Sequence, residues 1–238
     1  MRRICILFAI VLALNVGSAL AGPLDITNIL GSWANAQPGG ITALNVNNVA
    51  NQGTDTVRWG DPLGQSQSGY NFTPASNLTS VALGTPLLLG TFQHVNQPVF
   101  GTALGSIDYN FSFSTNGNPA NLGVVFHFVH DETTNDTPCA AGPEGPSLSI
   151  CDDFVNITSG SLNQVITVGS DTYFFNLLGF SKDGGLTTRT GFQSQENGTT
   201  TAGLYGVVTT TPVPEPTTLV LLVISLGGVA ALRQAKKI

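Results

Sequence analysis

Apolar and polar residues alternate with a period of two along much of the chain, as in β-strands with one buried and one solvated face. The clearest case is SIDYNFSFS, residues 106–114, in which every second residue from Ile107 to Phe113 is apolar. No long segment between residues 24 and 210 repeats apolar residues at the 3.6-residue period of a helix. The pattern therefore predicts an all-β protein.

Turn signals separate the predicted strands. The segment LGVVFHFVH, Leu122 to His130, is more continuously apolar and is expected to be a central strand. Gly169-Ser170-Asp171 predicts one hairpin, and Asp183-Gly184-Gly185 predicts a second. GLYGVVTTT reads as the last strand, and ten to twelve strands are expected in all. In a chain of 238 residues this favours one β-sandwich, jelly-roll-like, over residues 22–211.

The first 21 residues have the pattern of a secretory signal peptide. Arg2 and Arg3 precede an apolar stretch from Ile4 to Leu14, and Ala19-Leu20-Ala21 supplies small residues for cleavage. We therefore expect export, with Gly22 as the mature N-terminus.

Residues 212–238 form a separate C-terminal signal. The sequence VPEP is followed by an uncharged run, Thr217 to Leu232, and by the basic residues Arg233, Lys236 and Lys237. As a helix this run would span about 24 Å, slightly less than the roughly 30 Å hydrocarbon core. We expect a marginal membrane helix with its basic end in the cytoplasm.

This tail resembles the PEP-CTERM sorting signal of Gram-negative bacteria. The resemblance implies recognition of Pro214, Glu215 and Pro216 by an exosortase, with Thr217 to Leu232 as a transient anchor in the inner membrane. It also implies a final location at the cell surface or in the extracellular matrix, with extracellular polysaccharide as a partner. The basic end RQAKKI is looser than the tight arginine cluster usual in that family.

Three motifs in the body of the chain, TVRWGDP, SGYNF and LGTFQHVNQPV, resemble successive signatures of the THxN family of PEP-CTERM proteins. The name-giving Thr-His-x-Asn stands here as Gln93-His94-Val95-Asn96, with glutamine in place of threonine. This resemblance implies a β-rich extracellular domain and no particular activity.

The charge balance excludes one class of function. Charged residues make up 9% of the chain and the net charge is −6. Between Gly22 and Pro212 there are 13 acidic residues, against the three basic residues Arg58, Lys182 and Arg189. Nucleic-acid binding needs a basic surface, so it is excluded. Binding to anionic lipid is disfavoured for the same reason.

Two cysteines remain after removal of the signal peptide, Cys139 and Cys151. In an oxidising compartment an isolated pair is expected to form a disulfide, worth about 3 kcal/mol on the chain-entropy model. No histidine lies near enough in sequence to suggest a zinc site formed by these thiols.

His94 is the first candidate for a functional residue. On a strand, His94 and Asn96 point to the same face, where they either bind a ligand or tie a loop to the sheet. The structural alternative is favoured. Arg58, next to Trp59, is expected to form a structural salt bridge with Asp61 or another carboxylate.

Metal ligands are not evident from sequence spacing. His127 and His130 would share a face on a helix, but on a strand they point to opposite faces, which argues against chelation. Acidic residues gather around the predicted disulfide, and they suggest either a solvated rim or a calcium site; the set is Asp131, Glu132, Asp136, Glu144, Asp152 and Asp153. No metal ligand set is assigned, and calcium is kept as the less favoured alternative to no cofactor.

Catalysis finds little support. The chain has no G-x-S-x-G elbow and no free cysteine after export. The favoured function is therefore a non-enzymatic structural or adhesive protein of the exopolysaccharide layer or biofilm. A carbohydrate-binding module is the alternative, with Trp33, Trp59 and Tyr70 as the aromatics to stack on sugars. A secreted hydrolase is less favoured still.

Overall fold

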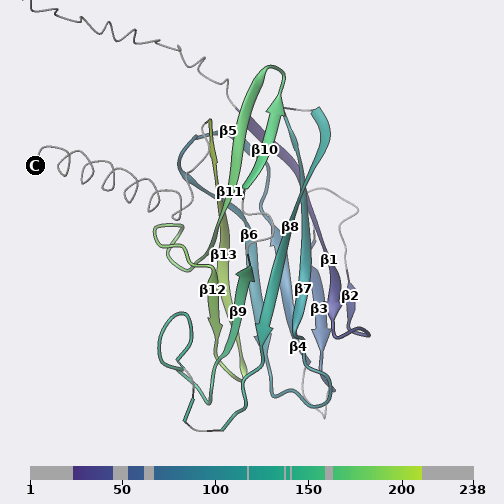
Figure 1. Ribbon diagram of the computed structural model, residues 1–238, viewed down its shortest axis with the longest axis vertical. Helices are drawn as coiled ribbons and strands as arrows, with labels where there is room; N and C mark the ends of the chain where they lie inside the picture. Colours follow the sequence, from purple (N-terminus) through teal and green to yellow (C-terminus); the bar gives the residue numbers. More distant parts are fainter. Residues whose placement is uncertain are drawn as a thin grey trace, which may run out of the picture.

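A computed structural model of the chain describes residues 24–44, 53–61, 67–116, 118–136, 138–139, 141–158 and 163–210. Within these ranges the chain forms thirteen strands (Figure 1). They are β1 (Leu24–Gln37), β2 (Thr42–Leu44), β3 (Asp55–Trp59), β4 (Ser68–Pro74), β5 (Leu78–Val81), β6 (Pro86–Asn96), β7 (Ser106–Thr115), β8 (Asn118–Asp131), β9 (Asp153–Thr158), β10 (Asn163–Val168), β11 (Asp171–Ser181), β12 (Gly191–Ser194) and β13 (Gly198–Thr209).

The strands form two antiparallel sheets. One has six strands in the order β12-β9-β8-β7-β1-β5, and the other has seven in the order β10-β11-β13-β6-β4-β3-β2. The sheets pack on one another through aromatic rings. For example, Phe92 of β6 and Phe128 of β8 stack with centroids 5.7 Å apart and planes 10° apart. The prediction of an all-β protein with two packed sheets, a β-sandwich, is thereby confirmed.

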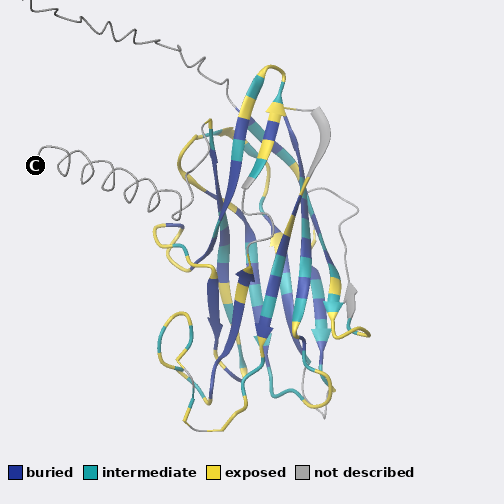
Figure 2. Cartoon of the chain, in the orientation of Figure 1, coloured by how far each residue is buried: buried dark blue, intermediate teal, exposed yellow. Residues whose placement is uncertain are grey.

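Alternating burial produces this core (Figure 2). In β7 the residues Ile107, Tyr109, Phe111 and Phe113 are each no more than 2% exposed, and the polar residues between them are half-buried, as the alternation predicted. The same two-residue period continues in β6 and β8. Because so many inward positions carry aromatic rings, the sandwich is filled mainly by phenylalanine, tyrosine and tryptophan.

The predicted connections are partly correct. β8 lies inside its sheet between β7 and β9, and Val168 pairs with Asp171 across the two-residue turn Gly169-Ser170. The predicted hairpin at Asp183-Gly184-Gly185 is wrong, because β12 pairs with β9 in the other sheet. Only a single bridge, Phe180 to Arg189, joins the two sides of that turn.

Local hydrogen bonds explain why the chain makes a closed loop at this turn instead of a hairpin. The Ser181 hydroxyl accepts a hydrogen bond from the Gly185 amide at 2.9 Å, and the Asp183 carboxylate accepts one from the Thr187 amide at 2.9 Å. These side chains compete with strand pairing for the backbone donors of the turn. The chain then crosses to the other sheet.

The predicted disulfide is present. Cys139 and Cys151 are joined in the long connection between β8 and β9. The predicted signal peptide at 1–21 and the sorting motif at Pro214, Glu215 and Pro216 lie outside the described residues. In the part of the chain that is described, no helix is long and apolar enough to cross a membrane.

Candidate functional site

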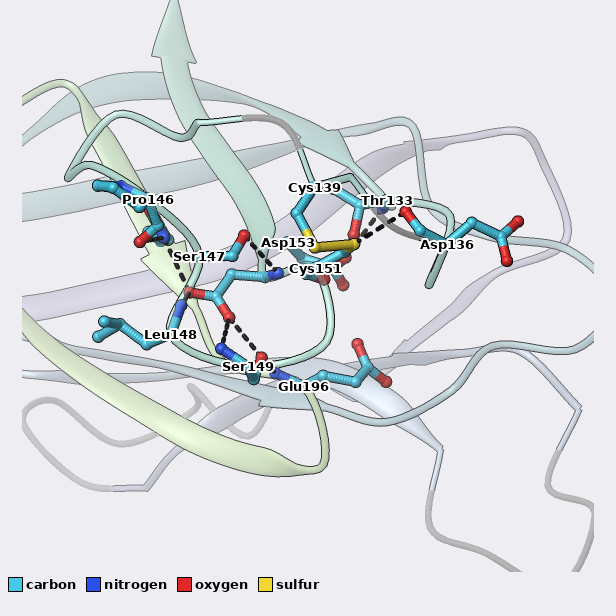
Figure 3. Close-up of a disulfide and its surroundings, with 12 residues drawn as sticks. Thr133, Asp136, Cys139, Pro146, Ser147, Leu148, Ser149, Cys151, Asp153 and Glu196 are labelled. Atoms are coloured by element: carbon cyan, nitrogen blue, oxygen red, sulfur yellow. Dashed lines mark hydrogen bonds between the residues drawn. A yellow bond between two sulfur atoms is a disulfide. The ribbon is translucent and has the colours of Figure 1, made fainter.

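Five ionisable side chains from distant parts of the chain gather at one end of the sandwich. His94 comes from β6 in the seven-stranded sheet, and His130 and Asp153 come from β8 and β9 in the six-stranded sheet. Glu132 follows β8, and Glu196 lies in the turn between β12 and β13. The group therefore lies between the two sheets, and its members Asp153 and Glu196 lie near the disulfide (Figure 3).

The strand period places the two histidines in the interior. Phe92 and His94 share the inward face of β6, and Phe128 and His130 share the inward face of β8. The positions nearer the middle of the sandwich are aromatic, and the next inward position on each strand is histidine. The two imidazoles therefore meet, with ring centroids 5.2 Å apart.

His130 has a polar contact at each ring nitrogen, whereas Asp153 is held through one carboxylate oxygen only. The Nδ1 atom of His130 lies 2.7 Å from the Tyr70 hydroxyl. Its other nitrogen, Nε2, lies 3.2 Å from Oε2 of Glu132 and 3.9 Å from Oδ2 of Asp153. Oδ1 of Asp153 accepts hydrogen bonds from the backbone amide and the hydroxyl of Thr133, at 2.9 Å and 3.2 Å.

His94 is buried without polar contacts. Its side chain is 0% exposed, and neither ring nitrogen has a hydrogen-bond partner among the described residues. The rings of Trp59 and Tyr70 lie beside it, with centroid distances of 5.7 Å and 5.1 Å. A buried imidazole without partners is costly, because the nitrogens lose their hydrogen bonds to water.

The site is electrostatically unfavourable as it stands. Burial lowers the pKa of His94 well below its usual value, and His130 lowers it further. Burial also lowers the pKa of His130 to about 4, although Asp153 opposes this change. Burial raises the pKa of Asp153 to about 7, with Glu132 adding to the shift.

The two glutamates show the same effect. Burial raises the pKa of Glu132 to about 7, and the Trp59 side chain partly offsets the shift. Burial and the charge of Glu132 raise the pKa of Glu196 to about 7. Hydrogen bonds to its carboxylate act in the opposite direction and only partly offset this shift. Strongly shifted groups gathered in one place are a feature of functional sites.

The donor atoms of three of these residues are close enough to share one ligand. Each residue offers one donor atom, and the three atoms lie within 4.8 Å of one another. The residues are His94, His130 and Asp153, and all three side chains are buried. Two imidazole nitrogens and one carboxylate oxygen form a donor set that suits zinc and related transition metals.

A cavity borders the carboxylate side of the cluster. Its volume is about 580 Å³, and Glu132 and Glu196 line it together with Phe100 and Ile150. The Phe100 side chain is 51% exposed and that of Ile150 is 59% exposed. This cavity combines two carboxylates with apolar side chains at the surface.

The prediction for Arg58 is wrong. Its guanidinium donates to the backbone carbonyls of Val57 and Tyr70 at 2.8 Å and 2.9 Å, and to the Asn71 side chain at 2.6 Å. Within the described residues no carboxylate forms a salt bridge with it. The side chain folds back over its own strand because Gly69, opposite it on β4, has no Cβ; one there would lie 2.5 Å from Cδ of Arg58.

The aromatics considered for sugar stacking are in the core. Trp33 and Trp59 are 2% exposed and Tyr70 is 0% exposed. These side chains cannot stack on an external ring. Trp59 instead forms one wall of the histidine cluster.

The acidic residues around the disulfide have separate structural roles (Figure 3). Asp152 accepts hydrogen bonds from the backbone amides of Leu148 and Ser149, both at 2.9 Å, and from Gln193 at 2.8 Å. It therefore holds the loop in shape, whereas its neighbour Asp153 points into the buried cluster.

Spacing along the sequence separated His127 from His130 but did not reveal the partners of His130. His127 and His130 do lie on opposite faces of β8; His127 contacts Asp108 at 2.6 Å, and its side chain is 42% exposed. The partners of His130 are instead His94 and Asp153, which are 36 and 23 residues away. Their common signal in the sequence is a polar residue at an inward position of a strand.

Asn96, on the same face of β6 as His94, makes a contact of its own. Its side-chain amide donates to the Ser194 carbonyl at 3.2 Å and so ties β6 to the end of β12.

No protein-family model matches this chain, and no curated protein is significantly similar to it.

Proposed function

We propose that this is an exported, non-enzymatic protein of the cell surface or extracellular matrix, processed by an exosortase and structural or adhesive in the exopolysaccharide layer. The observation that carries the proposal is the order of signals along the chain. Residues 1–21 resemble a signal peptide, and Pro214-Glu215-Pro216, an apolar run and a basic end follow the β-sandwich. The Cys139–Cys151 disulfide supports it, because such bonds persist outside the cytosol.

The sorting step has a direct test. We expect Glu215→Ala to leave an unprocessed, membrane-associated chain, and deletion of the exosortase to have the same effect. Thr218→Ser, just beyond the motif, is the control and should be processed normally. Unchanged size and location of the Glu215 variant, followed by immunoblotting of membrane and medium fractions, would reject the sorting proposal.

Carbohydrate binding is the second candidate, and one observation favours it. The cavity next to Phe100 combines an exposed aromatic ring with the carboxylates of Glu132 and Glu196, which suits stacking on a sugar and hydrogen bonding to its hydroxyl groups. A glycan array probed with the purified protein, with and without calcium, tests this. We expect Phe100→Ala to lose any binding that the wild type shows, and Val165→Ala, at an exposed position on β10, to retain it.

A further inference from the structure

We propose that His94, His130 and Asp153 bind one divalent transition-metal ion of the zinc type between the two sheets. This goes beyond the proposed surface role and does not depend on it. It rests on the contacts of the three side chains and on their chemistry.

The three residues direct donor atoms to one place, and those of His94 and Asp153 have no hydrogen-bond partner among the described residues. His130 contacts Tyr70 through Nδ1, and its Nε2 faces two carboxylates, with Glu132 Oε2 at 3.2 Å and Asp153 Oδ2 at 3.9 Å. Asp153 uses Oδ1 to bind Thr133, and Oδ2 has no hydrogen-bond partner among the described residues. His94 has both nitrogens unused. His130 and Asp153 show the division typical of metal ligands, in which one atom is oriented by the protein and the other faces the ion.

The distances suit one ion. In a tetrahedral zinc site with ligands at about 2.0–2.2 Å, the donor atoms lie roughly 3.4 Å apart. The three donors here lie within 4.8 Å of one another, and His130 Nε2 is 3.9 Å from Asp153 Oδ2. We expect rotation of the three side chains to bring the donors closer when the ion binds.

The donor chemistry selects the class of metal. Calcium and magnesium prefer oxygen ligands, and two imidazoles disfavour both. Imidazole nitrogen with carboxylate oxygen suits zinc, iron(II) and neighbouring ions. Glu132 is placed to supply a fourth ligand, since its Oε2 lies 3.2 Å from His130 Nε2. Ionised Asp153 and Glu132 would balance the two charges of the ion.

The ion also gives the buried groups partners. Without it, His94 has no polar contact, and Asp153 is buried with Oδ2 unpaired among the described residues. Such an arrangement is unfavourable for folding, and a dication at its centre provides both coordination and opposite charge.

The full chain, without an affinity tag, is purified in detergent from an exporting bacterial host, and its metal content is measured by mass spectrometry. It is then stripped with a chelator and titrated with Zn²⁺ and Co²⁺. We expect one ion per chain, a rise in melting temperature with Zn²⁺, and Co²⁺ absorption bands typical of nitrogen and oxygen ligands. His94→Phe should retain the fold and melt in chelator at or above the wild-type temperature, because phenylalanine fits an aromatic site without buried nitrogens.

Variants of the proposed ligands test whether these side chains bind the ion. His94→Phe and Asp153→Asn should weaken Zn²⁺ binding by roughly 100-fold or more, since each removes a direct ligand. His127→Ala, the exposed histidine of the same strand, is the control and should bind like wild type. The proposal is overturned if the wild type neither contains nor binds stoichiometric metal, or if His127→Ala weakens binding as much as His94→Phe.

Discussion

The imidazoles of His94 and His130, one from each sheet, meet inside the sandwich at 5.2 Å between ring centroids and 88° between ring planes. They are 36 residues apart in the chain and belong to strands that do not pair with each other. Their meeting therefore depends on how the sheets pack.

Tyr70 is a positioning residue for His130. Tyr70→Phe removes the hydroxyl that lies 2.7 Å from Nδ1 of His130. We expect a loss of about 1–2 kcal/mol in unfolding free energy, because a buried nitrogen loses its partner. Zn²⁺ affinity should fall about 10- to 100-fold, as for other residues that orient a ligand. Urea unfolding and Zn²⁺ titration measure the two effects, and Tyr205→Phe is the control. Unchanged affinity would show that this hydroxyl does not orient His130.

The disulfide should stabilise the loop that carries Thr133 and Asp153. Replacing Cys139 and Cys151 together by serine should lower the unfolding free energy by about 3 kcal/mol, because the unfolded chain regains the entropy of an open loop. The Thr133 hydroxyl also donates to the Cys151 carbonyl at 2.6 Å, so Zn²⁺ binding should weaken as well. Chemical unfolding with and without reductant measures the change. A wild type that is indifferent to reductant would contradict it.

Stability in the presence of chelator should fall as the pH rises from about 6.5 to 8. The pKa values of Glu132, Asp153 and Glu196 are each raised to about 7 by burial, so the folded state binds protons that the unfolded state has released. Their favourable contribution is complete at low pH and is lost as the pH passes through 7.

The two histidines change the stability in the opposite direction, and they do so at lower pH. The lowered pKa values of His94 and His130 cost stability as the pH falls below their usual value of 6.5, and they partly cancel the carboxylate effect there. Urea midpoints between pH 5 and 8 should show the decline above 6.5, and Asp153→Asn should reduce it. A midpoint that rises across that range would contradict the prediction.

The stacked pair Phe92 and Phe128 should be critical for the core. Both side chains are fully buried, and they join the two sheets. Phe128→Ala should lower the unfolding free energy by about 3–5 kcal/mol, from lost apolar burial and the cavity left behind. Phe100→Ala, at a 51% exposed side chain, should cost much less in the same thermal or urea unfolding experiment. Equal losses for the two variants would show that the assigned core is incorrect.

Several features of the fold were predictable because they depend on local pattern. The alternation in β7 identified its buried face, and the two residues before Asp171 identified a hairpin. The second predicted hairpin failed because Ser181 and Asp183 bind the backbone of the turn, which strand pattern does not reveal. The predicted salt bridge of Arg58 is wrong for a similar reason. The hydrogen-bond donors of its guanidinium are taken up by a nearby backbone carbonyl and by the Asn71 side chain.

The inward-facing residues can be read from the amino-acid pattern, because side-chain direction on a strand alternates with each residue. This alternation places His94 and Asn96 on one face, separates His127 from His130, and predicts the β-sandwich. The proximity of His94, His130 and Asp153 follows instead from the packing of the two sheets. Distances between residues on different strands depend on strand order and on the packing of two sheets, and neither quantity is contained in the spacing along the chain.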